Sequence, residues 1–82
     1  MIHGRKDYTK KIQDAFPGFI PFNEPVFLIR GQDKVGAEVV RFWAKRAKEE
    51  GADPALIRKV LRHATKMEKW PKKKVADCPA GQ

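Results

Sequence analysis

The sequence has no serine, one cysteine and two histidines, and this scarcity limits the chemistry open to the chain. No serine nucleophile is available. The sequence also does not place a cysteine next to a histidine as a nucleophile and its base, because His3, His63 and Cys78 lie in different parts of the chain. These residues also fall short of the spaced ligand clusters of structural zinc sites. We therefore predict a protein that is not an enzyme and that holds neither a metal nor another cofactor.

Long apolar runs are missing as well. The longest is Val26–Ile29, whereas a membrane-spanning helix needs about 20 apolar residues. Residues 1–6 lack the apolar stretch of a secretory signal, and the lone Cys78 cannot form a disulfide within the chain. We expect a soluble, cytoplasmic protein whose 82 residues form a single small domain.

Acidic residues are sparse relative to basic ones. The chain carries 18 Lys and Arg against 10 Asp and Glu, a net charge of +8. Residues 33–50 are nearly neutral, whereas residues 53–74 hold eight cations against only Asp53 and Glu68. A chain this basic attracts polyanions, so the segment 53–74 is where we look for an anion-binding surface.

Prolines and charge divide the chain into three parts. Residues 1–25 are predicted to form an extended arm, since the first 11 residues are basic without periodicity and Pro17, Pro21 and Pro25 disfavour a helix. The β-branched and aromatic run Val26–Arg30 predicts a short strand, opening a folded part that covers residues 26–70. Residues 71–82 are predicted to be a flexible basic tail.

Two amphipathic helices are predicted after the strand. The first, about 34–50, has Asp33 as N-cap and ends at Gly51, and the second, about 54–70, begins at Asp53-Pro54. The residues expected to face the core are Val35, Val39, Phe42 or Trp43, and Ala47 in the first helix, and Leu56, Val60, Ala64 and Met67, flanked by Ile57 and Leu61, in the second. The short link between the helices predicts an antiparallel hairpin, so the fold class is mainly α.

One segment resembles a known group of proteins. The run Glu24–Asp33, preceded by Ile20-Pro21 and followed later by Trp70–Lys73, resembles small proteins encoded by bacteriophages and prophages. The resemblance implies an accessory phage protein made inside a bacterial cell, and it brings no known activity or binding residue with it. Small phage proteins of this kind often bind host machinery or counter host defence, which favours an inhibitor or a sequestering protein.

The second helix carries the main functional signal. At about 100° per residue, Arg58, Arg62, Lys66 and Lys69 fall within one quadrant, opposite the predicted apolar stripe. Four like charges in one row repel one another, and an anion would relieve that repulsion. The alternative is a solvated surface without a ligand.

Neighbouring residues extend this candidate site. Lys72 and Lys73 add charge, and Trp70 either stacks on a nucleobase or covers the open end of the hairpin. Arg30 stands beside the start of the first helix, where backbone N–H groups could hold a single phosphate. Alternatively, Gly31 makes a turn and Gly36 allows close packing. A nucleotide-hydrolysing phosphate loop is excluded, because Ala37 and Glu38 replace the Lys and Ser/Thr that it requires.

Three kinds of function remain. The first is binding of a phosphate-bearing ligand, either nucleic acid or a nucleotide signal. The second is inhibition of a host protein that presents an acidic surface, and the third is a structural role in a phage particle. A lone strand at Val26–Ile29 would leave both of its edges unpaired, so its partner is either residues 8–12 or 19–22 of the same chain or the same strand of another copy. Because the core is small, we predict the second case, a homo-oligomer and most simply a two-fold dimer.

Overall fold

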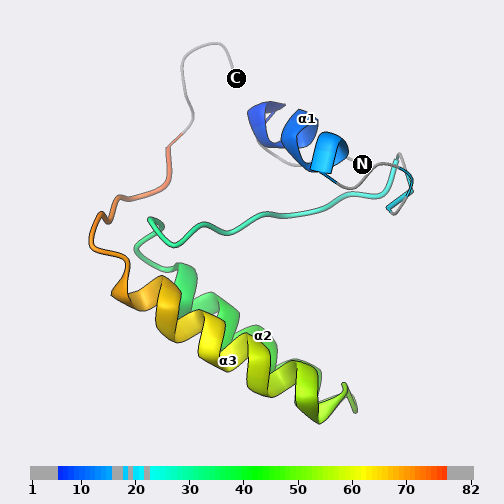
Figure 1. Cartoon of the computed structure of the whole chain (residues 1–82), viewed down its shortest axis with the longest axis vertical. Coiled ribbons are helices and arrows are strands. Elements are labelled where there is room, and N and C mark those ends of the chain that lie inside the picture. The colour runs from blue at the N-terminus through cyan, green and yellow to red at the C-terminus, as the bar shows by residue number, and fades with distance from the viewer. Residues whose placement is uncertain (1–5, 16–17, 19, 22, 78–82) are drawn as a thin grey trace. The chain divides into compact units, whose positions relative to one another are not determined.

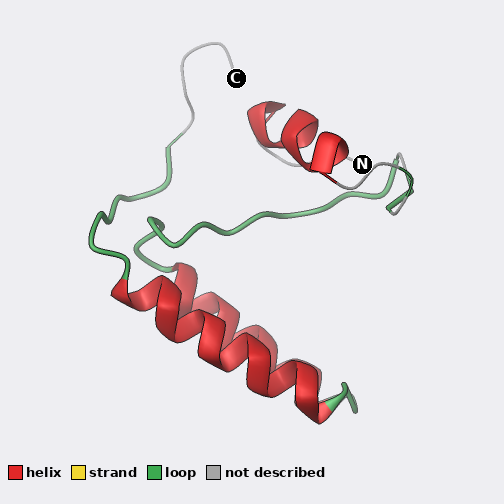
Figure 2. Cartoon of the chain, in the orientation of Figure 1, coloured by secondary structure: helices red, strands yellow, loops and turns green. Residues whose placement is uncertain are grey.

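The computed structural model describes residues 6–15, 18, 20–21 and 23–77 of the chain. Three helices account for most of these residues: α1 (Lys6–Ala15), α2 (Gly36–Glu49) and α3 (Pro54–Lys69) (Figure 1). Figure 2 shows helices and loops, with no strand drawn in the described part of the chain. The prediction of a mainly helical protein is confirmed.

The chain divides into two compact units, which are described separately. The described residues up to Leu28, together with Asp77, belong to the first unit, and Ile29–Ala76 form the second. In the first unit Tyr8 is only 8% exposed, and the half-buried Ile20 and Val26 pack against it. His3, Pro17 and Cys78, which entered the sequence interpretation, lie outside the described residues.

The prediction of an extended arm was wrong for residues 6–15, which form α1. The apolar residues Tyr8, Ile12 and Ala15 recur at helical spacing, and two further features support a helix here. Asp7 lies in the first turn, where a negative charge complements the helix dipole, and Lys10 and Asp14 form an i,i+4 ion pair at 3.9 Å. The helix also buries the Tyr8 side chain.

The predicted strand at Val26–Arg30 was also wrong, because these five residues, all of them described, are in no strand. Of their four apolar side chains, Val26 and Ile29 are half-buried in different units, while Phe27 and Leu28 are exposed. Val26 packs near Tyr8 in the first unit, and in the second unit Ile29 packs on the start of α2. A β-branched run becomes a strand only where another segment supplies ladder hydrogen bonds.

Close packing at Gly36 fixes the start of α2. A Cβ atom added at Gly36 would lie 2.9 Å from the carbonyl oxygen of Arg30 and 3.0 Å from Cγ2 of Ile29. The interpretation that Gly36 allows close packing is therefore confirmed. The predicted N-cap was displaced by two residues: Val35 caps α2 without a side-chain hydrogen bond, and Asp33 Oδ1 instead accepts the Val35 N–H at 3.0 Å, in the turn before the helix.

The link between α2 and α3 contains the predicted end of the first helix at Gly51 and the predicted start of the second at Asp53-Pro54. Gly51 has φ +88°, and the N–H groups of Gly51 and Ala52 donate to the carbonyl oxygens of Lys48 (3.0 Å) and Ala47 (2.9 Å). This pair of bonds is the Schellman arrangement, which ends a helix at a residue with positive φ. Asp53 then caps α3 by accepting the Ala55 N–H at 2.8 Å, with Pro54 as the first helical residue, as predicted.

Helices α2 and α3 lie side by side (Figure 1) and pack through small residues. Ala44 is 1% exposed and Ala64 is 0% exposed. The buried and half-buried positions repeat with spacings of three and four along both helices: Ala37, Val40, Ala44 and Ala47 in α2, and Ile57, Val60, Ala64 and Met67 in α3. Small side chains along such a seam let the two helix backbones approach closely.

The predicted core was therefore misplaced for several large residues. Of the α2 set, Val35, Val39, Phe42 and Trp43 are exposed and only Ala47 lies in the seam. In α3, Leu56 and Leu61 are exposed, while Ile57 is buried. The error has a simple physical origin: the hydrophobic pattern of α2 allows two apolar faces, and the face of small residues is the one that packs on α3.

Candidate functional site

The cations predicted on α3 do form one surface. Arg58, Arg62, Lys66 and Lys69 are all exposed, and helical geometry places them opposite the buried Ile57, Ala64 and Met67. We call these four residues the basic face. Among the described residues, no carboxylate lies within ion-pair distance of any of the four, in contrast to Arg46 of α2, which pairs with Glu49 and with Glu50 (3.5 Å).

The acid closest in sequence to the basic face is engaged elsewhere. Glu68, the one acidic residue within α3, receives two hydrogen bonds from Arg41 of α2, at 3.0 and 3.2 Å. These hydrogen bonds, followed by the charge of Arg41 and then those of Lys73 and Lys69, lower the pKa of Glu68 below its usual value. Because Glu68 forms its ion pair with α2, none of the four cations of the basic face has an ion-pair partner on its own helix.

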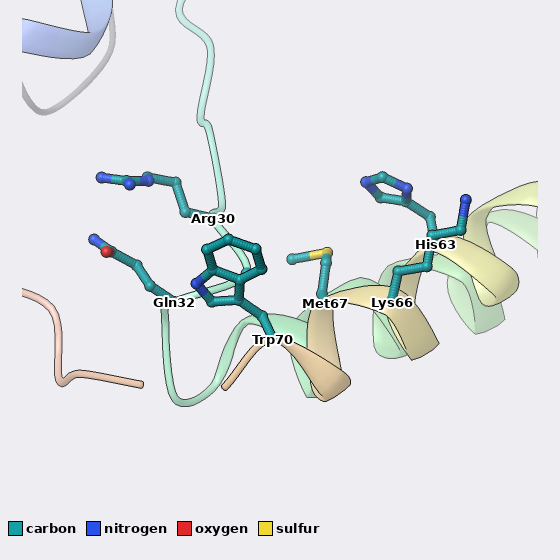
Figure 3. A pocket seen from close by; sticks show the side chains of 7 residues that line it. Arg30, Gln32, His63, Lys66, Met67 and Trp70 are labelled. Atoms are coloured by element: carbon teal, nitrogen blue, oxygen red, sulfur yellow. The ribbon is translucent and has the colours of Figure 1, made fainter. Parts of the chain in front are cut away.

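A pocket of about 350 Å³ opens at one end of this surface. The loop before α2 contributes Arg30, Gly31 and Gln32, and the last turns of α3 contribute His63, Lys66, Met67 and Trp70. We call it the α3 pocket. In Figure 3 Met67 lies between Trp70 on one side and His63 and Lys66 on the other, with Arg30 and Gln32 beyond Trp70. The pocket is open to solvent and combines two cations, two ring side chains and an amide.

The loop that lines the pocket is held by the segment after α3. The ammonium group of Lys73 donates to the carbonyl oxygens of Gly31 (2.8 Å) and Met67 (2.6 Å). Lys74 exchanges backbone hydrogen bonds with the loop, donating to Gln32 O at 2.8 Å and accepting from Lys34 N–H at 3.0 Å. Lys73 and Lys74 belong to the segment that was predicted to be a flexible tail, and their hydrogen bonds connect it to the pocket wall.

Three backbone donors at the start of α2 are used within the protein. The N–H groups of Lys34, Val35 and Gly36 donate to Lys74 O, Asp33 Oδ1 and Asp33 O, each at 3.0 Å. These donors are therefore already satisfied within the protein. Gly31 lies in the turn closed by the Asp33 N–H and the Arg30 carbonyl oxygen, as the alternative interpretation of this loop predicts.

The predicted residues are thus distributed over three places. Arg30, Lys66 and Trp70 meet at the α3 pocket, whereas Arg58, Arg62 and Lys69 continue along the basic face. Lys72 is exposed, and Lys73 has the structural role just described. Arg30 and Trp70 are far apart in sequence but come together because Gly31 packs against the end of α3. A Cβ atom added at Gly31 would lie 3.4 Å from Trp70 Cβ.

Four pocket residues were not among the predicted site residues: Gly31, Gln32, His63 and Met67. A signal existed for two of them, because His63, Met67 and Trp70 have the spacing i, i+4 and i+7, which lines up side chains along one side of a helix. No comparable signal marked Gln32, whose position depends on the hydrogen bond that its carbonyl oxygen accepts from Lys74.

A second exposed surface lies on α2. Val35, Val39, Phe42 and Trp43 recur at helical spacing and are all exposed, with Phe42 at 63%. We call these four residues the apolar face of α2. Apolar side chains gathered on one face of a helix are a common feature of surfaces that contact other proteins.

Within the described residues, no group of three or more His, Cys, Asp or Glu side chains is placed to hold a metal ion. Nor do these residues include a helix that combines the length and the apolar character needed to cross a bilayer. Comparison of the chain with protein-family models, with curated proteins and with solved structures finds no match.

Proposed function

We propose that the protein is a binding protein for a phosphate-bearing ligand, a nucleic acid or a nucleotide, and that the basic face of α3 is its contact surface. The observation that carries this proposal is the pairing of Glu68 with Arg41 of α2. The pairing leaves a row of four exposed cations without an ion-pair partner on their own helix.

The energetics favour a polyanion over a single small ion. Four like charges spaced along about three turns of helix repel one another, and successive phosphates would neutralise them together. Binding would also release the counterions that a phosphate backbone holds, which adds favourable entropy at low salt. The net charge of +8 attracts such a ligand before contact is made.

The biological setting is proposed from the resemblance of residues 24–33 to small phage proteins. On that basis the protein acts in the cytoplasm of a bacterial host. There it would sequester a nucleotide signal or occupy a nucleic acid, and in either case it would counter a host defence.

Charge reversal tests the proposal. Arg58→Glu with Arg62→Glu should weaken binding of a fluorescent 20-nucleotide single strand by about tenfold or more at low salt. The matched control is Lys45→Glu with Lys48→Glu, which changes the net charge equally but places the new acids on α2. Fluorescence anisotropy gives the affinities. Equal weakening by both pairs would refute a specific contact surface, because bulk charge would then explain the binding.

A second function is favoured by the apolar face of α2. We propose, as the alternative, that this face binds a protein, either a host factor that is inhibited or a further copy of the chain. The homo-oligomer no longer rests on an unpaired strand, since residues 26–30 form none. Phe42→Ser would abolish such an association in light scattering or pull-down experiments, and the association itself would persist at high salt, unlike phosphate contacts.

A further inference from the structure

We infer that the α3 pocket receives one unpaired nucleobase, with Trp70 as the stacking surface and Arg30 and Lys66 beside the phosphates that the base carries. This inference rests on the proposed function and names its ligand more closely: a phosphate-bearing base with a free face, supplied either by a free nucleotide or by a single strand. Trp70 is 53% exposed, so its ring is open to a ligand.

Trp70 provides the stacking surface without a second ring. His63 lies seven residues earlier in the chain, about 10.5 Å away along the helix axis at about 1.5 Å per residue, and Figure 3 shows Met67 between the two rings. A base that stacks on Trp70 therefore does not also stack on His63, which lines the other side of the pocket.

The floor and the edge of the pocket suit a nucleobase as well. Met67 is 8% exposed, so its polarizable thioether forms an apolar floor on which an aromatic ligand can rest. Gln32 lines the pocket from the loop, and its side-chain amide offers both a donor and an acceptor to the edge of a base. A volume of about 350 Å³ is at the small end of the usual range for small-ligand sites.

Lys66 connects the pocket with the rest of the surface. It lines the pocket and also belongs to the basic face, where Arg62 and Arg58 follow at intervals of four residues. A strand that places one base on Trp70 can therefore lay its neighbouring phosphates along α3. A base inside a duplex has both faces covered by stacking, so the pocket selects unpaired bases.

The test uses the full-length chain and four probes: adenosine monophosphate, a hexamer of deoxyadenylate, an abasic strand with the same number of phosphates, and a 12-base-pair duplex. In a Trp43→Phe background Trp70 is the one tryptophan, since the sequence has two. We expect the hexamer to quench its fluorescence and the abasic strand and duplex to leave it unchanged. Quenching by the monophosphate at a comparable affinity assigns the site to free nucleotides, and quenching by the hexamer alone assigns it to a strand.

Substitutions at Trp70 provide a second measurement. Trp70→Leu should weaken hexamer binding by about 5- to 150-fold, which corresponds to one base–aromatic stack, and should leave binding of the abasic strand unchanged. Trp70→Phe keeps a ring and should retain most of the affinity. Trp43→Leu, which alters the other tryptophan, is the matched control, and melting temperatures show that each variant folds.

The results separate the inference from the proposed function. Three results together would overturn the nucleobase site: the abasic strand binds as tightly as the hexamer, Trp70→Leu leaves the affinity unchanged, and the Arg58/Arg62 charge reversal still weakens binding. The phosphate-binding proposal would then still stand. Failure of all four probes to bind at low salt overturns both.

Discussion

Arg41 on α2 donates to both carboxylate oxygens of Glu68 on α3, at 3.0 and 3.2 Å. Arg41 lies in the second turn of α2 and Glu68 is the penultimate residue of α3, so the pair ties the start of one helix to the end of the other. The same contact withdraws the one acid of α3 from the basic face. One ion pair therefore contributes both to the packing of the helices and to the charge of the candidate site.

The Arg41–Glu68 pair predicts a pH-dependent contribution to stability. The pKa of Glu68 is lowered in the folded chain, chiefly by the hydrogen bonds from Arg41. Its contribution is therefore complete above the unfolded-state pKa, about 4.3, and disappears as the pH falls through the lower folded-state value. We expect Glu68→Gln to melt at a lower temperature than the native chain at pH 7, and the difference to vanish in strong acid.

Thermal melting followed by circular dichroism between pH 7 and pH 2 measures this effect. Glu38→Gln, an equivalent change at an exposed position of α2, is the control and should show a smaller difference at pH 7. A Glu68→Gln variant that stays equally less stable at every pH would assign the loss to packing and contradict the linkage.

The seam of alanines predicts intolerance of larger side chains. Ala64 is 0% exposed against α2, so Ala64→Leu must separate the two helices or distort them. We expect a loss of about 1–3 kcal/mol in the free energy of unfolding, measured by urea denaturation. The same substitution at the exposed Ala55 of α3 should change stability by no more than about 0.5 kcal/mol. Equal effects at the two positions would show that Ala64 does not pack closely.

The second half of the fold was largely predictable because its signals are local. Asp53-Pro54 marks the start of α3, and Gly51 ends α2 with a positive φ; both act through backbone geometry within a few residues. The face of α2 that packs could not be assigned in the same way. Small residues such as Ala44 lose little when exposed, so hydrophobicity alone favoured Phe42, and only the partner helix decides between the two faces.

The first 30 residues show the limits of the same reasoning. Tyr8, Ile12 and Ala15 recur at helical spacing, but this period was missed because the basic arm was interpreted only up to residue 11, and the run Val26–Arg30 forms no strand. In the candidate site, spacing along α3 was enough to bring Lys66 and Trp70 together. The position of the loop at Arg30 depends on hydrogen bonds to Lys73 and Lys74, which no local pattern reveals.

Lys73 is predicted to stabilise the fold, while Lys72 is not. The ammonium group of Lys73 satisfies the Met67 carbonyl oxygen at the end of α3 and the Gly31 carbonyl oxygen in the loop. Lys73→Met should therefore lower the free energy of unfolding by about 1 kcal/mol. Lys72→Met removes the same charge from a side chain that makes no hydrogen bond or ion pair in the described part of the chain, and it should have little effect. Urea denaturation of both variants measures the difference. Equal free energies of unfolding for the two variants would mean that the hydrogen bonds of Lys73 to Gly31 and Met67 are not formed in solution.

The slope of affinity against salt concentration is predicted to reflect the number of cations of the basic face that contact phosphates. If Arg58, Arg62, Lys66 and Lys69 each neutralise one phosphate of a single strand, the logarithm of the association constant should fall with the logarithm of salt concentration with a slope of about −3, from about 0.7 per contact. Lys69→Gln should reduce the magnitude of that slope by about 0.7, because it removes one contact without touching the α3 pocket or the helix seam. Lys48→Gln, an exposed cation on α2, should leave the slope unchanged. Anisotropy titrations of a labelled strand between 20 and 200 mM salt, about a tenfold range, resolve a change of this size. A native slope close to zero would show that the ligand is held by apolar contacts, and the apolar face of α2 would then become the surface to mutate.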